Sequence, residues 1–188
     1  MSRLSALSID ALPDDLKATM MAGENIMGFT PNDGLIMARA PEMLNAFLGL
    51  VQSIYQPSAL DNDLKKLLGL MTSSASGCQY CQAHTQYGAL KHGITEQKIA
   101  AIWEYQTSDL FSPAEREALD VARNAALVPN AVTDEQFIRL KAHFNEVQIV
   151  EIVGVISLFG FLNRWNATFK TDIESAPAMA SAKFTSTS

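Results

Sequence analysis

Three features are scarce in this sequence, and each scarcity narrows the class of protein. Cysteine occurs only twice in 188 residues, so disulfides do not staple the fold. Basic residues number 14 against 20 acidic ones and form no run that could follow a phosphate backbone, so we expect no nucleic acid as a partner. The longest apolar stretch, residues 152–162, is far shorter than the roughly 20 residues of a membrane helix, so we expect no membrane span. Residues 1–12 lack an apolar region of signal-peptide length, which predicts a cytoplasmic protein.

The sequence predicts an all-α fold. Apolar residues recur at spacings of three and four almost throughout, and no window alternates as a strand does. Capping boxes begin at Ser112 and Thr133, and Asn145 marks a third helix start. The third leads into residues 147–169, which are apolar on nearly every face, as in a helix at the centre of a fold or in a subunit interface. Further helices are expected over residues 13–21, 41–54, 61–76, 78–92 and 95–103, with a loop over residues 28–34.

The length and the 48% hydrophobic content suit one domain, predicted over residues 1–174. The small and polar residues 175–188 predict a mobile tail, although Phe184 could dock on a neighbouring subunit. A weak internal repeat relates the two halves of the domain. Lys66 lies 12 residues before Cys78, as Glu151 lies 12 residues before Asn163. Chance similarity between helical segments explains this repeat as well as a duplication does.

The stretch SGCQYCQAHT, residues 76–85, brings both cysteines and a histidine together. If Cys78 begins a helix, Cys81 and His84 follow it at spacings of three and share its face. Backbone N–H groups at a helix N-terminus stabilise thiolates and so lower the pKa of a thiol. His84 is within reach as a base or as a charge partner for the thiolate. We therefore interpret the cysteines as a dithiol that cycles between two thiols and a disulfide.

Two other interpretations of this stretch remain open. The cysteines could be inert core residues, because free cysteine is among the most buried residue types. With His84 they could also supply three zinc ligands, although the chain has no second cysteine pair. A c-type haem is excluded, because Gln82 stands where the attachment motif has histidine. We expect no cofactor.

Glu151 is a further candidate site residue. It lies in an otherwise apolar run, where an unpaired carboxylate is costly. Two roles remain open for Glu151. One is an ion pair with Arg164 or a lysine, and the other is proton transfer.

The motif SGCQYCQAHT with its preceding helix, the segment GFTPNDGLIMARAPEMLNAFLGL and the late segment EIVGVISLFGFLNRWN resemble a known family. It is the carboxymuconolactone decarboxylase family, in its alkylhydroperoxidase (AhpD-like), peroxidase-related branch, and the similarity covers residues 25–170. The resemblance implies an AhpD-like helical fold and a homo-oligomer, a trimer or a hexamer.

The resemblance also implies a peroxiredoxin-type thiol chemistry with an antioxidant role. In that chemistry a peroxide oxidises Cys81 to a sulfenic acid, Cys78 resolves it to a disulfide, and a thiol or protein disulfide reductant restores the dithiol. His84 then belongs to the proton relay. The glutamate of that relay is expected where this chain has Lys66, and Glu151 is a substitute suggested by the repeat alone.

The leading hypothesis is therefore a thiol-dependent peroxidase or disulfide oxidoreductase that reduces hydrogen peroxide or organic hydroperoxides. A redox-responsive dithiol module that exchanges with a protein partner is the alternative from the binding class. Decarboxylation of a muconolactone ranks third, because that branch of the family does not rely on a cysteine pair.

Overall fold

The computed structural model describes residues 1–185, and every regular element in these residues is helical, as the apolar spacing predicts. Two short 3-10 turns are η1 (Ile9–Ala11) and η2 (Ala101–Glu104). The α-helices are α1 (Asp14–Met27), α2 (Asn32–Met37), α3 (Pro41–Tyr55), α4 (Asn62–Ala75), α5 (Gln79–His92), α6 (Glu96–Ala100), α7 (Pro113–Ala125), α8 (Asp134–Lys141), α9 (Glu146–Phe169) and α10 (Ser175–Thr185).

The predicted caps at Ser112, Thr133 and Asn145 set the starts of their helices, and a further cap begins α4. The side chain of Asp61 accepts the N–H of Asp63 at the start of α4. Reciprocal capping boxes are present at Ser112, Thr133 and Asn145, which begin α7, α8 and α9. These predictions are confirmed because a cap depends only on neighbours in sequence.

The N-terminal helices depart from the predicted bounds. Helix α1 continues to Met27, beyond the predicted end at Met21, and Gly28 ends it with a left-handed φ of 89°. Helix α2 begins at Asn32, inside the predicted loop.

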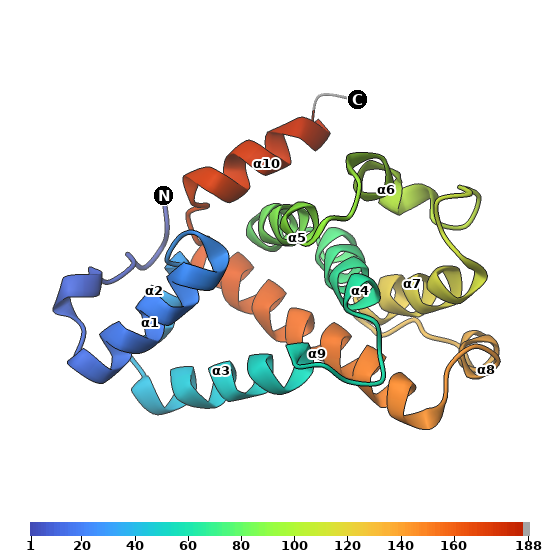
Figure 1. The fold of residues 1–188 in the computed structure, drawn as a ribbon, viewed down its shortest axis with the longest axis horizontal. Coiled ribbons are helices and arrows are strands. Elements are labelled where there is room, and N and C mark those ends of the chain that lie inside the picture. The colour runs from blue at the N-terminus through green and yellow to red at the C-terminus, as the bar shows by residue number, and fades with distance from the viewer. Residues whose placement is uncertain (186–188) are drawn as a thin grey trace.

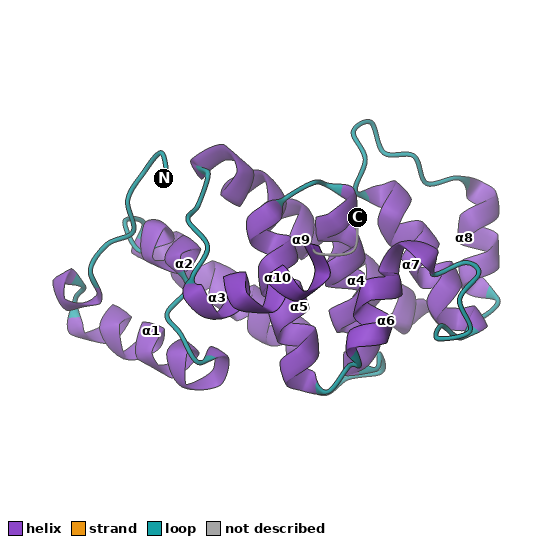
Figure 2. Ribbon diagram, turned by 90° about the horizontal axis from the view of Figure 1, so that it is seen from above, coloured by secondary structure: helices purple, strands orange, loops and turns teal. Residues whose placement is uncertain are grey.

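Helix α4 forms the centre of the fold. Nine of its 14 residues are buried, and it packs against α5, α7 and α9. Figures 1 and 2 show α1 to α3 at one end of the molecule, α6 to α8 at the other, and α9 running between them, with α10 lying across α5. A smaller core around Leu16, Met20 and Leu44 joins the three N-terminal helices.

Helix α9 is long and apolar enough, by length and composition alone, to cross a membrane. However, it packs against α3, α4, α5, α7 and α8, and Ile152, Val155 and Leu158 are buried in the core. Its composition is therefore that of a central helix, and no membrane protein is indicated.

The C-terminal segment differs from the prediction. Residues Ser175–Thr185 form α10 in place of the mobile tail that their composition predicts. Ala180 is buried, and Phe184 packs against the main core of its own chain, so apolar contacts order this segment. Residues 186–188 of the predicted tail lie outside the described residues.

The two segments of the weak repeat also differ in structure. The first is broken between α4 and α5 at Gly77, whereas the second lies within the continuous helix α9. The similarity in pattern therefore does not produce two equivalent helical units.

The contact between α4 and α9 yields a test of the core. A Cβ added at Gly69 would clash with the ring of Phe159. We expect Gly69→Ala to lower the free energy of unfolding by about 1–3 kcal/mol, because overpacking displaces the ring. Gly88→Ala is the control, since a Cβ there meets nothing within 4 Å, and it should stabilise α5 by up to ~1 kcal/mol. Equal effects in urea unfolding would contradict this packing.

Candidate active site

The two cysteines lie where the chain turns from α4 into α5. Gly77 adopts a φ of 68° at this turn, a conformation that residues with a Cβ rarely adopt. Cys78 is the N-cap of α5, and its Sγ accepts the N–H of Cys81 at 3.4 Å. The two Sγ atoms are 2.8 Å apart, and both residues are free cysteines with 3% of their surface exposed. The pair is thus placed to form a disulfide with little backbone movement.

His84 lies one turn beyond Cys81, as its spacing predicts, but its ring is paired with a carboxylate. Nε2 of His84 is 2.6 Å from Oε2 of Glu174, in the segment between α9 and α10. The imidazole stacks on the ring of Tyr80, with centroids 4.1 Å apart. The phenol of Tyr80 donates to Oε1 of the same Glu174 at 2.9 Å. A histidine, a phenol and a carboxylate therefore form one connected proton network beside the thiols.

The network sets the ionisation of its carboxylate. Burial alone would raise the pKa of Glu174, but the hydrogen bond and charge of His84 outweigh it, and the pKa is lowered. A backbone N–H from Asn32 also donates to this carboxylate. Burial raises the pKa of Tyr80 well above its usual value, which keeps the phenol protonated.

A second carboxylate, Asp33, approaches the thiols from the start of α2. Its Oδ2 accepts the Nδ2 amide of Asn166 at 3.2 Å, and the same Nδ2 is 3.6 Å from the Sγ of Cys81. The backbone N–H of Asp33 donates to the hydroxyl of Tyr80 at 3.3 Å. Asn166 therefore links a carboxylate to a thiol sulfur.

The structure does not bring Glu151 or Lys66 to the sulfurs. Glu151 lies in α9 about 22 Å along the helix axis from Asn166, and its carboxylate accepts from Ser58 and from the backbone N–H of Leu60. These contacts indicate a structural role for Glu151. The Nζ of Lys66 lies 4.2 Å from the ring centroid of Tyr55, away from the site.

The two carboxylates are not indicated by the sequence, and neither is the link between the amide of Asn166 and the thiols. Asp33 lies in a segment predicted as a loop, and Glu174 is the last residue of the predicted domain. Glu174 is 90 residues from His84 in sequence, and no local pattern signals that pairing. One feature of the sequence could have indicated the amides of the site. It is the pattern NxxN, in which Asn163 and Asn166 are three residues apart, as the cysteines are.

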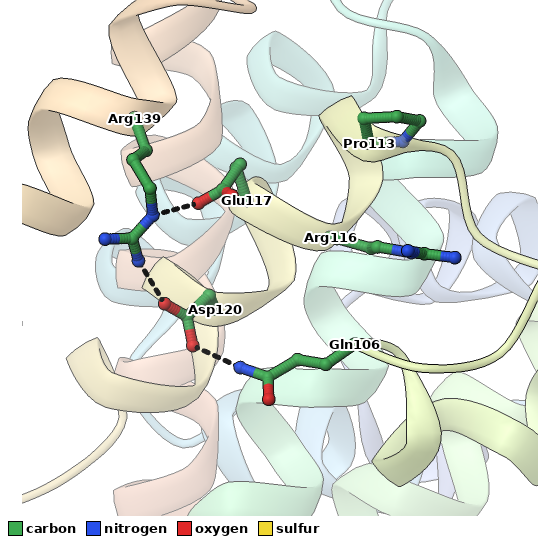
Figure 3. A pocket seen from close by; sticks show the side chains of 6 residues that line it. All are labelled: Gln106, Pro113, Arg116, Glu117, Asp120 and Arg139. Atoms are coloured by element: carbon green, nitrogen blue, oxygen red, sulfur yellow. Dashed lines mark hydrogen bonds and ion pairs between the residues drawn. The ribbon is translucent and has the colours of Figure 1, made fainter.

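A polar cavity of about 410 Å³ lies away from the thiols, between α7, α8 and the residues that follow η2 (Figure 3). Asp120 accepts from Arg139, Gln136, Gln106 and Tyr105 there. Arg139 pairs with Glu117 and Asp120, and Arg116 donates to the carbonyl oxygen of Ser108. We therefore assign the Arg139 pairs to the packing of α8 on α7. Within residues 1–185, no group of three His, Cys, Asp or Glu side chains is arranged to hold a metal ion.

The pairing of Glu174 with His84 predicts a pH-dependent stability. The folded pKa of Glu174 lies below 4.5, so the pair stabilises the fold above about pH 4.5, and this contribution is lost as the pH falls through the folded pKa. We expect Glu174→Gln to lower the free energy of unfolding by about 1–3 kcal/mol at pH 7, with the difference from the natural chain narrowing below pH ~4.

The control for this measurement is Glu96→Gln, which removes an exposed ion pair with Lys183 and should change stability by less than ~0.5 kcal/mol. Urea unfolding across pH 3 to 8 provides the comparison. A Glu174→Gln effect independent of pH would rule out the ion pair as the cause.

Comparisons with known proteins agree with this fold. The model of the carboxymuconolactone decarboxylase family matches residues 41–124. The protein YdfG of Bacillus subtilis (strain 168) is 31% identical over 129 residues, 68% of this chain and 84% of YdfG. A variant of the debrominase Bmp8 in complex with 2,3,4-tribromopyrrole is 33% identical, with a TM-score of 0.89 over 96% of each chain.

An AhpD-core, peroxidase-related protein from Ralstonia eutropha JMP134 is 22% identical, with a TM-score of 0.82 over 94% of each chain, and shares the fold. The family model and the YdfG match together establish that this chain belongs to the carboxymuconolactone decarboxylase family.

Proposed function

We propose that this chain is a dithiol oxidoreductase that reduces its substrate by two electrons and ends each turnover with a Cys78–Cys81 disulfide. The observation that carries the proposal is the pair of free sulfurs 2.8 Å apart beside the Tyr80–Glu174–His84 network. Two thiols supply the two electrons, and the network supplies and accepts protons. A thiol or protein disulfide reductant in a reducing, cytoplasmic setting would restore the dithiol.

The leading substrate class is a peroxide, which makes the chain a peroxiredoxin-type enzyme with an antioxidant role. One thiolate attacks the hydroxyl oxygen of the hydroperoxide, so the O–O bond breaks and an alcohol and a sulfenic acid form. The second thiol then displaces water and closes the disulfide. Burial of both sulfurs favours a substrate as small as hydrogen peroxide or a short hydroperoxide.

A brominated aromatic heterocycle is the second candidate, favoured by the likeness to the debrominase over 96% of both chains. Two thiols could replace C–Br by C–H, with release of hydrogen bromide and formation of the same disulfide. The side-chain oxygens of Asn163 and Asn166 are buried without a hydrogen-bond partner. Either the O–H of a hydroperoxide or the N–H of a pyrrole could donate to them.

Paired assays separate the two substrates. The reduced chain should consume hydrogen peroxide or an alkyl hydroperoxide, or release bromide from a bromopyrrole, with loss of two free thiols per chain. Cys78→Ser and Cys81→Ser should each abolish turnover, because both electrons come from this pair. His84→Gln should lower it by ~10²-fold, since the proton relay is broken.

His92→Gln is the matched control, because His92 lies on the same helix but pairs with the exposed Asp63. It should leave turnover unchanged. If neither substrate class is consumed while the disulfide exchanges rapidly with a thioredoxin-like donor, the redox-responsive module is the better assignment. Muconolactone decarboxylation that survives Cys78→Ser would overturn the dithiol proposal.

We further propose that copies of this chain assemble through one face of α3 and α9, as the expected trimer or hexamer requires. Six exposed apolar side chains lie on these two helices, and we call them the α3/α9 face: Met43, Leu50, Val147, Val150, Val153 and Phe161. The 24-residue helix α9 is about 36 Å long, and with α3 it offers on the order of 600 Å². A stable interface needs about 800 Å² per partner, so this face supplies most of that area.

Light scattering after size-exclusion chromatography tests the assembly. Val150→Asp should shift the chain toward the monomer, because a buried carboxylate without a partner is costly. Ile138→Asp is the control, since Ile138 is equally exposed but lies on α8 outside this face. A monomeric natural chain, or equal effects of both changes, would contradict the proposal.

A further inference from the structure

Two buried amides of α9 face the turn that carries the cysteines. Asn163 and Asn166 lie one turn apart on the same face of α9, with only 4% and 2% of their surfaces exposed. The Nδ2 of Asn163 donates to the hydroxyl of Ser76 at 3.0 Å. The Nδ2 of Asn166 lies 3.6 Å from the Sγ of Cys81. Both amides therefore belong to the immediate surroundings of the dithiol.

The partners of the two amides fix the direction in which each group points. The Nδ2 of Asn166 donates to Oδ2 of Asp33 at 3.2 Å. The Nδ2 of Asn163 donates to the backbone carbonyl oxygen of Thr72 at 3.4 Å. Carboxylate and carbonyl oxygens only accept hydrogen bonds, so an amide turned the other way would set oxygen against oxygen. The two Oδ1 atoms are therefore held in place as acceptors, and Asp33 orients Asn166.

Both of these acceptor oxygens are unsatisfied. The Oδ1 atoms of Asn163 and Asn166 are buried, and among residues 1–185 no hydrogen-bond donor reaches either of them. A buried acceptor without a donor loses the hydrogen bonds that it makes with water in the unfolded chain. Native folds retain few such atoms, and two of them on one helix face beside a reactive pair indicate a donor from outside the chain.

The unsatisfied oxygens lie where a substrate would meet the sulfurs. In Asn166, Oδ1 and Nδ2 are bonded to the same carbon, so Oδ1 lies beside the nitrogen that is 3.6 Å from the Sγ of Cys81. A donor bound to this oxygen is therefore held next to that sulfur. Because the carboxylate of Asp33 accepts from the same amide, the local charge favours a neutral ligand over an anion. In a hydroperoxide, the oxygen that donates is also the one that a thiolate attacks.

We propose that Asn163 and Asn166 determine the specificity of the dithiol site, because their Oδ1 atoms accept a hydrogen bond from an O–H or N–H group of a neutral substrate. Asp33 is a positioning residue that orients the amide of Asn166. The inference rests on the proposed dithiol function. A molecule of the same shape without a donor leaves both acceptors unpaired, so the site rejects it. The O–H of a hydroperoxide and the N–H of a pyrrole share the required chemistry.

Protection of the thiols by unreactive probes tests the inference on the natural, reduced chain. Pyrrole offers an N–H, n-propanol offers an O–H, and furan has the shape of pyrrole without a donor. A probe bound at the amides covers Cys81, so it should slow the alkylation of Cys81 by iodoacetamide, which mass spectrometry measures. The concentration that halves the rate should be at least about tenfold higher for furan than for the better donor probe.

Removal of each acceptor tests the two amides. In Asn163→Ala and Asn166→Ala, the preference for the donor probe over furan should fall toward equality. Asn62→Ala is the matched control, because Oδ1 of Asn62 is also buried without a partner but lies at the start of α4, about 20 Å along the helix axis from Ala75. It should leave the preference unchanged. A preference that survives both changes on α9 would overturn the inference.

The measurement on the natural chain needs no variant, so it decides the inference even where the loss of an amide prevents folding. Stronger protection by pyrrole assigns the donor to an N-heterocycle, and stronger protection by n-propanol assigns it to a hydroperoxide. Protection by furan equal to that of the better donor probe, or no protection by either donor probe, would overturn the inference. None of these measurements uses turnover, so the absence of peroxide or bromopyrrole reduction would count against the proposed function alone.

Discussion

The carboxylate of Glu174 is the contact on which the arrangement of the site depends. It accepts from the backbone of Asn32, the phenol of Tyr80 and the imidazole of His84, which belong to α2 and to the first two turns of α5. A buried carboxylate is tolerated only when such donors satisfy it. The ring stack of Tyr80 on His84 and the approach of α10 to α5 both follow from this one group.

The site around the dithiol is rich in acceptors and negative charge. Asp33 is linked to the Sγ of Cys81 through Asn166, and Glu174 binds the neighbouring Tyr80 and His84. Within residues 1–185 no lysine or arginine pairs with either carboxylate. Such surroundings disfavour a substrate that carries a carboxylate, as a muconolactone acid does. They suit a neutral molecule that offers a hydrogen-bond donor and accepts electrons, which both proposed substrate classes do.

The sequence predicted what depends on near neighbours. Helical periodicity, the caps at Ser112, Thr133 and Asn145, and the helix that begins at Cys78 are all local, and each is present. The carboxylates could not be predicted, because Asp33 and Glu174 reach α5 only through tertiary packing. The position 12 residues before Cys78 holds Lys66, and the repeat suggests Glu151 in its place. Neither reaches the sulfurs, since a repeat in pattern does not fix which helices meet.

The boundaries of the family match separate the site into two parts. Residues 41–124 contain both cysteines, Tyr80 and His84, whereas Asp33, Asn166 and Glu174 lie outside them. The two thiols and the Tyr80 and His84 members of the proton network thus belong to the matched segment, whereas the two carboxylates and the Asn166 amide come from the flanking segments. Membership of the family therefore accounts for the segment that carries the thiols, and the carboxylates that a substrate would meet have to be located in the remainder of the chain.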